Sequence, residues 1–164
     1  MTAPSSTPPS FLDRFEQAFL LMAGVCLVTV VAAQGWQVAS RYFLGDPPSW
    51  TDPLSTTLMA HAAMIGAAAG VRRGTHFAFT SLADAAPGPI KRFLKALSHL
   101  AVIAAGLLLC AYGAHLVLLD AGAKMPGAPL SLGLKYTPLV LGGALMALFG
   151  CEALVARPKT EPQP

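Results

Sequence analysis

Long uncharged, largely apolar runs alternate with short polar connections along the 164-residue chain. The runs are Gln17–Ser40 (24 residues), Pro53–Val71 (19), Ala96–Leu119 (24) and Tyr136–Ala156 (21), the last broken only by Glu152. An apolar helix of about 20 residues covers a hydrocarbon core of roughly 30 Å. The pattern therefore predicts an all-α integral membrane protein with four transmembrane helices.

The composition supports this class, because 54% of the residues are hydrophobic and only 12% are charged. A soluble domain carries roughly a quarter charged residues and uses them to cover its surface. The expected organisation is a disordered Pro/Ser/Thr tail over residues 1–10, a four-helix transmembrane domain over 11–156, and a second tail over 157–164.

A cleavable signal peptide is the alternative interpretation of the first apolar run. Signal peptides combine a basic leading segment with an apolar core of about 7–15 residues. Here Arg14 lies between the acidic residues Asp13 and Glu16, and the uncharged run that follows is longer. A retained first helix, from about Phe11 to Ser40, is the preferred prediction.

The distribution of positive charge predicts how the helices are oriented. Eight of the eleven Lys and Arg residues lie in the two tails or between the second and third runs: Arg14, Arg72, Arg73, Lys91, Arg92, Lys95, Arg157 and Lys159. The other three are Arg41, Lys124 and Lys135. Because Lys and Arg accumulate on the cytoplasmic side, we expect both termini inside. The net positive charge of +3 is then explained by membrane topology and by attraction to anionic lipid, and the sequence shows no sign of a nucleic-acid site.

The two ends of the second apolar run carry different side chains. Arg41 and Trp50 precede the run, at the outer interface under this topology, where a long cation and an aromatic ring are favoured. Asp52 is predicted to cap the second helix, with Pro53 as its first helical residue. At the inner face the run is followed by Arg72, Arg73 and His76. We expect the outer flank to contact a partner protein or lipid headgroups.

Small residues predict where helices pack closely. Ala62, Gly66 and Gly70 recur every four residues in the second helix, and Gly143 and Ala147 have the same spacing in the fourth. Small side chains at this spacing let two helices approach backbone to backbone in lipid. The Gly66–Gly70 face is therefore a predicted packing seam.

The third helix is predicted over Pro89–Leu119, 31 residues or about 46 Å at 1.5 Å per residue. This length exceeds the hydrocarbon thickness, so its first two turns should lie among the headgroups. Lys91, Arg92 and Lys95 occupy one face of these turns and apolar residues the other. Such a basic interfacial stretch is typical of an anchor to the membrane surface, and a cradle for a partner is the alternative.

The sequence lacks the side chains that transport chemistry or catalysis would need. No acidic residue lies in the middle of a run, where ion-coupled transporters place theirs. Glu152 lies near the cytoplasmic end and is expected to reach toward Arg157. No nucleophile motif or phosphate-binding loop occurs, and Cys26, Cys110 and Cys151 have neither metal-site nor disulfide spacing. We expect no enzyme activity, no metal, no cofactor, and no transport of solute by the chain alone.

Two histidines leave one alternative function open. His61 and His115 are predicted at similar depth on separate helices, where together they could ligate a haem iron axially. That interpretation gives a four-helix haem-b electron-transfer membrane protein. In the simpler interpretation, each histidine bonds a carbonyl or hydroxyl of a neighbouring helix.

Three motifs frame the second helix: RYF at 41–43, WTD at 50–52 and RRGTHF at 72–77. Together they resemble the motifs of the DctQ-type small membrane subunit of TRAP (tripartite ATP-independent periplasmic) transporters. The resemblance covers about residues 12–156 and includes four spans with both termini inside. The chain departs from the family at Pro53, where a second acid is common, and near Lys135, where an aromatic residue is common.

The resemblance implies a non-catalytic subunit of a sodium-driven uptake symporter in the bacterial inner membrane. Family members pair with a larger membrane subunit that holds the sodium and substrate sites. A periplasmic substrate-binding protein delivers an organic acid to that subunit. The small subunit is then a scaffold that stabilises the large one in the bilayer. The candidate contacts to these partners are Arg41, Trp50, Asp52, Gly66, Gly70, Arg72, Arg73 and His76.

Overall fold

The structure is a computed structural model that describes residues 11–73 and 88–155. Its helices are α1 (Phe11–Ala39), a π-helical turn (Ser40–Leu44), α2 (Thr51–Arg72), α4 (Gly88–Leu119), a 3-10 turn (Leu132–Tyr136) and α5 (Thr137–Val155). Outside the helices, the described residues contain one isolated antiparallel bridge, between Lys124 and Ser131. Four helical segments are long and apolar enough to cross a membrane: Leu12–Leu44, Thr51–Arg72, Ala96–Leu119 and Leu132–Leu154. The predicted all-α fold with four spans is confirmed, while the predicted tails lie outside the described residues.

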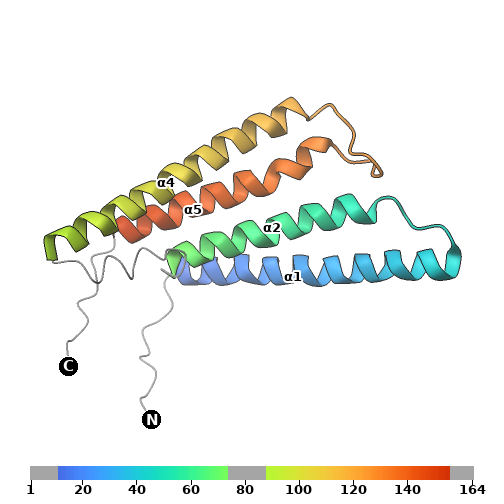
Figure 1. The fold of residues 1–164 in the computed structure, drawn as a ribbon, viewed down its shortest axis with the longest axis horizontal. Helices are drawn as coiled ribbons and strands as arrows, with labels where there is room; N and C mark the ends of the chain where they lie inside the picture. The colour runs from blue at the N-terminus through green and yellow to red at the C-terminus, as the bar shows by residue number, and fades with distance from the viewer. Residues whose placement is uncertain (1–10, 74–87, 156–164) are drawn as a thin grey trace, which may run out of the picture.

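The four long helices lie side by side in the order α1, α2, α5, α4 (Figure 1). α1 and α2 form one antiparallel hairpin, α4 and α5 form another, and the hairpins meet where α2 packs on α5. Because successive helices alternate in direction, α1 begins and α5 ends at the same end of the molecule. We name this the Arg72 end and the opposite one the Asp52 end. The outer helices α1 and α4 diverge toward the Asp52 end (Figure 1).

The core lies between the two central helices. Ile65 and Ala68 of α2 and Phe149 of α5 are almost completely buried. The edge helices α1 and α4 expose large apolar side chains, such as Val28 and Leu107. Exposed apolar surface is costly in water but not in a hydrocarbon core. The burial pattern is therefore that of helices bordered by lipid or by other apolar helices.

α4 and α5 approach each other closely through glycines. A Cβ added at Gly143 would lie 2.6 Å from the carbonyl oxygen of Gly106 and from the backbone nitrogen of Cys110. A Cβ added at Gly106 would lie 2.8 Å from the backbone nitrogen of Ala147. Only residues without a side chain allow such backbone contact. The packing seam predicted at Gly143 and Ala147 is confirmed.

Gly66 lies in a different environment. A Cβ added there would meet no atom within 4 Å, and Gly66 and its neighbour Ala63 are both exposed. Gly70, one turn further along α2, is half-buried. α2 therefore turns the Gly66 face away from the other described helices. The predicted close approach at Gly66 does not occur within this part of the chain.

The start of α2 differs from the prediction that Asp52 caps it. α2 begins at Thr51, and the preceding residue Trp50 makes no side-chain capping bond. The Thr51 hydroxyl donates to the carbonyl oxygen of Pro48 at 2.8 Å, so the chain turns into the helix before Asp52 is reached. The Asp52 carboxylate instead accepts a bond from Gln37 Nε2 of α1, at 3.0 Å. Asp52 therefore joins two helices and caps neither.

Two other helix boundaries are informative. The first helix was predicted to end at Ser40, but it continues as a π-helical turn to Leu44 and ends at Gly45, whose φ is 69°. Glycine adopts this left-handed conformation without steric cost, which explains why the helix ends there. The third helix was predicted over Pro89–Leu119 and is observed as one uninterrupted helix over Gly88–Leu119, which confirms it.

Candidate functional site

An ionic cluster gathers around Arg72, the last residue of α2. Arg72 Nη1 donates to Glu16 Oε2 at 2.6 Å, and Nη2 donates to Asp13 Oδ1 at 2.8 Å, so both bonds reach α1. Its Nε and Nη2 donate to the two carboxylate oxygens of Glu152 in α5, at 2.9 and 3.1 Å. Arg73 Nε donates to the remaining oxygen of Glu16 at 2.7 Å. These five residues, which we call the Arg72 cluster, tie α1, α2 and α5 together.

The centre of the Arg72 cluster is shielded, while its margin is open, since the side chain of Arg73 is 59% exposed. The side chains of Arg72 and Glu16 are 13% and 11% exposed, while those of Glu152 and Asp13 are 28% and 46% exposed. The guanidinium of Arg72 also lies over the Phe149 ring, 5.7 Å from its centroid. A planar guanidinium with several fixed donors is suited to joining three carboxylates at once.

Glu152 has a partner that the sequence analysis did not foresee. Glu152 was expected to reach toward Arg157, but both of its carboxylate oxygens accept bonds from Arg72. Arg157 lies outside the described residues. The acid side chains near the Arg72 end thus contribute to packing between helices, and the sequence analysis did not foresee this cluster.

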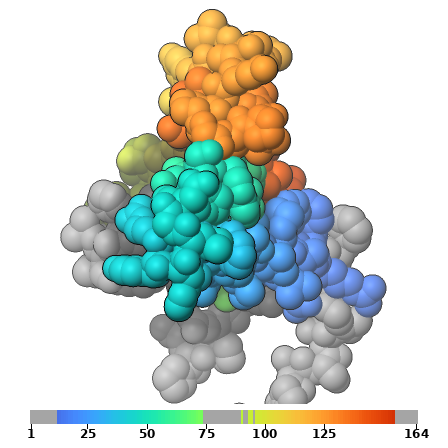
Figure 2. All heavy atoms as spheres, turned by 90° about the vertical axis from the view of Figure 1, so that its right-hand side faces the viewer, coloured from blue at the N-terminus to red at the C-terminus, as the bar shows by residue number. Residues whose placement is uncertain are grey.

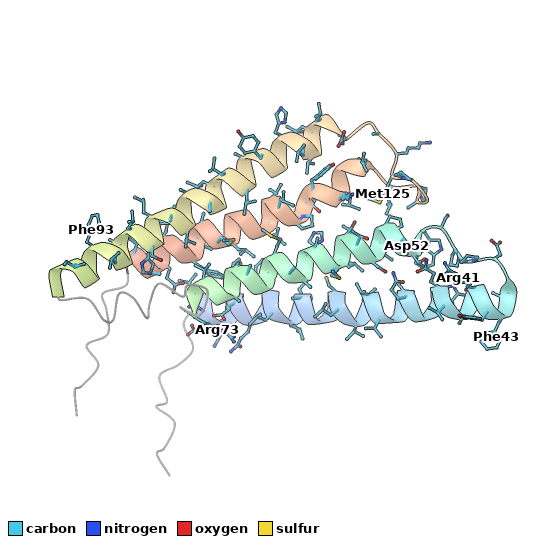
Figure 3. All side chains as sticks on the ribbon, in the orientation of Figure 1. Arg41, Phe43, Asp52, Arg73, Phe93 and Met125 are labelled. Carbon is cyan, nitrogen blue, oxygen red and sulfur yellow. The ribbon has the colours of Figure 1, made fainter. Side chains whose placement is uncertain are left out.

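The Asp52 end holds a small polar pocket between α1 and α2. It has a volume of about 270 Å³ and is lined by Gln34, Gln37, Val38, Arg41 and Asp52. Figure 3 shows Arg41 and Asp52 at this end and Arg73 at the other. The sequence analysis selected Arg41 and Asp52 as separate flanking residues. The structure brings them to one pocket, which we call the Arg41 pocket.

The two connections at the Asp52 end touch each other. The Ser49 hydroxyl donates to the carbonyl oxygen of Gly127 at 3.0 Å, joining the α1–α2 connection to the α4–α5 connection. Gly127 has a φ of 84°, and a Cβ there would lie 2.5 Å from the Ser49 carbonyl oxygen. Met125, in the same connection, is buried. Figure 2, which faces this end, shows the two connections next to each other.

The histidines do not favour the haem alternative. His61 Nδ1 donates to the carbonyl oxygen of Thr57 at 2.9 Å, and Nε2 lies 3.2 Å from the hydroxyl of Thr137. Nδ1 is thus bonded within α2, and Nε2 meets a hydroxyl of the neighbouring helix α5, as the simpler interpretation expects for His61. His115 is exposed on α4, which packs on α5, whereas α2 packs on α1 and α5. Among the described residues, no group of three or more His, Cys, Asp or Glu is arranged to hold a metal ion.

The structure distributes the predicted contact residues over three places. Arg41, Trp50 and Asp52 lie at the Asp52 end, and Gly66 and Gly70 lie along α2. Arg72 and Arg73 belong to the Arg72 cluster, so their carboxylate contacts are within the chain. His76 lies outside the described residues. That these residues contact a partner stays a prediction.

Comparison with known proteins identifies the family. The family model for the DctQ component of tripartite ATP-independent periplasmic transporters matches residues 28–159, more than half of the chain. The chain is also 26% identical over 77 residues to the sialic acid TRAP transporter small permease protein SiaQ of Vibrio cholerae serotype O1. That alignment covers 47% of this chain and 44% of SiaQ, so it spans less than half the length of that relative. The chain belongs to the DctQ family, the small permease component of TRAP transporters.

Proposed function

We propose that this chain is the scaffold subunit of a TRAP-type uptake transporter and carries no solute itself. The observation that supports this role is the location of its charges. The charged side chains of the four spans all lie near helix ends, and the most buried of them, Arg72 and Glu16, bond to each other. Ion-coupled transport requires polar groups at mid-depth. In this proposal, the larger membrane subunit supplies them.

The proposed location is the bacterial inner membrane, with both termini in the cytoplasm. The Arg72 end then faces the cytoplasm and the Asp52 end the periplasm, as the positive-inside rule requires for this charge distribution. α4 begins eight residues before the apolar segment Ala96–Leu119, and these first turns carry three basic residues. We propose that they lie among the cytoplasmic headgroups as an anchor. The tails at residues 1–10 and 157–164 are then cytoplasmic.

The proposed partners are a large membrane subunit and a periplasmic substrate-binding protein. The large subunit would hold the sodium and substrate sites, and the substrate class would be organic acids. The name of the relative SiaQ refers to sialic acid, a member of this class. α1 and α4 expose long apolar faces at the two edges of the row, which makes them available to a second membrane protein. The four helices would then enlarge the membrane-embedded part of the large subunit that does not move, and would stabilise it in the bilayer.

Co-expression tests this proposal directly. The tagged chain should retain the large subunit encoded with it through detergent extraction, and should not retain the large subunit of an unrelated transporter. Proteoliposomes with both subunits and the binding protein should take up an organic acid when a sodium gradient is imposed. Proteoliposomes with the small chain alone should take up none. Uptake by the small chain alone, or no stable complex with its own large subunit, would refute the scaffold role.

A further inference from the structure

The Arg41 pocket holds a cation and an anion apart. Arg41 and Asp52 both line it, yet no ion pair joins them, and the Arg41 guanidinium has no hydrogen-bond partner among the described residues. Asp52 Oδ1 accepts the bond from Gln37, which leaves Oδ2 for another donor. A site with separated opposite charges is complementary to a ligand that carries both charges.

An apolar stripe on α1 continues from the pocket. Leu27, Val31 and Val38 share a helical face with Gln34 and Arg41, because they are spaced by three, four or seven residues. All three apolar side chains are at least half exposed. The stripe leads from the pocket toward the middle of the span.

α2 also exposes apolar residues on the face that continues from the pocket. The face that carries Asp52 continues through Met59, Ala63 and Gly66, all of which are exposed. Ala63 and Gly66 are small, and a Cβ at Gly66 would meet no atom within 4 Å. Below the polar pocket, α1 and α2 therefore each expose apolar residues, and we call these two faces together the apolar path.

We propose that the Arg41 pocket binds the headgroup of a zwitterionic phospholipid such as phosphatidylethanolamine, with an acyl chain along the apolar path. The lipid phosphate accepts charge-assisted bonds from Arg41, and the ammonium donates to Asp52. The apolar stripe removes the acyl chain from polar surroundings. This inference rests on the proposed membrane placement, with the pocket in the periplasmic leaflet, and does not require the scaffold role.

The chemistry of the pocket disfavours other occupants. A soluble phosphate would make no use of the apolar path, and the carboxylate of Asp52 would repel it. An anionic phospholipid without an ammonium group would meet the same repulsion. An apolar helix of a partner would leave the Arg41 charge uncompensated, which is costly away from water.

Native mass spectrometry on the full-length chain in detergent tests the proposal. The probes are phosphatidylethanolamine, phosphatidylglycerol with the same acyl chains, and soluble phosphoethanolamine. The wild type should retain phosphatidylethanolamine about tenfold more strongly than the other two, and Arg41→Gln should lose about that factor. Asp52→Asn should abolish the preference over phosphatidylglycerol, while Asp52→Glu should keep it. Arg14→Gln, an exposed cation at the Arg72 end, is the matched control.

A separate variant tests the apolar path. Gly66→Leu should weaken retention of the lipid without changing the weak binding of phosphoethanolamine, since the substitution lies below the pocket and has room in the fold. Equal retention by the wild type and Arg41→Gln would overturn the proposal. Equal retention of phosphatidylethanolamine and phosphatidylglycerol would also overturn it, as would binding of phosphoethanolamine as strong as that of phosphatidylethanolamine. Efficient cross-linking of Gly66→Cys to the large subunit with lipid retention unchanged would overturn it too. Co-purification of the large subunit is measured separately on each variant, so loss of lipid selectivity is distinguishable from loss of the complex.

Discussion

Replacing Arg72 with glutamine should destabilise the chain by separating α1 and α5 from the end of α2. The substitution removes the bonds of Arg72 to Asp13, Glu16 and Glu152. Glutamine is shorter than arginine and neutral, and it cannot bond three carboxylates. Glu152 would then lose both of its bonds from Arg72, while Glu16 would keep the bond from Arg73.

The burial of each pair sets the expected magnitude. Removing one partner of a buried ion pair costs about 3–5 kcal/mol, whereas an exposed pair contributes about 0–1 kcal/mol. The pair with Glu16 is close to the buried case, because both side chains are less than 15% exposed, but Asp13 is 46% exposed. Arg73 also compensates in part. We therefore expect a loss of about 2–3 kcal/mol in the free energy of unfolding.

Thermal unfolding of the purified chain in a mild detergent measures this loss. For a domain of this size, 1 kcal/mol shifts Tm by about 2–4 °C, so Arg72→Gln should lower Tm by about 4–12 °C. Arg14→Gln is the matched control, because Arg14 is exposed and lies one residue from Asp13 in the sequence. A double-mutant cycle of Arg72→Gln with Glu152→Gln should give a coupling energy of about 1–2 kcal/mol.

Two outcomes would refute the reasoning. If Arg72→Gln and Arg14→Gln had the same Tm, the ion pairs of the cluster would contribute nothing to stability. If the coupling between Arg72 and Glu152 were zero, the bidentate contact would not hold α5. Arg72→Lys should fall between wild type and Arg72→Gln, since an ammonium keeps the charge but cannot reproduce the planar set of donors.

Three further substitutions can be measured by the same unfolding assay. Gly143→Ala should cost more than 2 kcal/mol, because its Cβ would meet the backbone of α4 at 2.6 Å, whereas Gly24→Ala, with nothing within 4 Å, should be neutral or slightly stabilising. Gly127→Ala should cost about 1–3 kcal/mol, since its φ of 84° and the nearby backbone both exclude a side chain, while Gly122→Ala should change Tm little. His61→Leu should cost about 1–2 kcal/mol through two lost hydrogen bonds, and its visible absorption spectrum should equal that of wild type.

The helices could be predicted from the sequence because the length of an apolar run is local information. The run Ala96–Leu119 needs no knowledge of its neighbours to be recognised as a span, and its helix was placed within one residue at each end. The order α1, α2, α5, α4 depends on which side chains meet, and hydropathy does not contain that information. The cap at Asp52 failed for the same reason. Its carboxylate is engaged by Gln37, fifteen residues earlier and on another helix.

The glycine seam shows why the spacing of small residues was a partial guide. Gly66 and Gly70 have the four-residue spacing of a packing motif, yet Gly66 faces away from the described helices. The close contacts of α4 and α5 involve Gly106 and Gly113, and Gly143 and Gly150, which are seven residues apart within each helix. Seven residues make about two turns, so each pair lies on one face. The seven-residue spacing of these glycines could have predicted the contact between α4 and α5. The sequence analysis considered only the four-residue spacing.

The Arg72 cluster was missed because each of its charges has an ordinary explanation when taken alone. Asp13 and Glu16 read as the polar start of the first helix, Arg72 as a positive-inside residue, and Glu152 as an acid near a helix end. The sequence analysis did not compare the depths at which these four residues lie in the membrane. Under the predicted topology all four lie at the same face of the membrane, where an acid at the edge of an apolar run requires a cationic partner.

The contacts between helices indicate that α1 should detach from the other three helices most easily. α4 and α5 are held by a backbone seam, and their connection also bonds to Ser49 at the Asp52 end. α1 packs on α2, and among the described residues its polar ties to other helices include Gln37 to Asp52 at one end and the Arg72 cluster at the other. Both ties are electrostatic, and both lie at helix ends where water and headgroups can compete for them. Loss of the Arg72 cluster should therefore loosen α1 before it loosens the α4–α5 hairpin. Proteolysis or hydrogen exchange of Arg72→Gln should report opening first in residues 11–39, and uniform opening of all four helices would contradict this order.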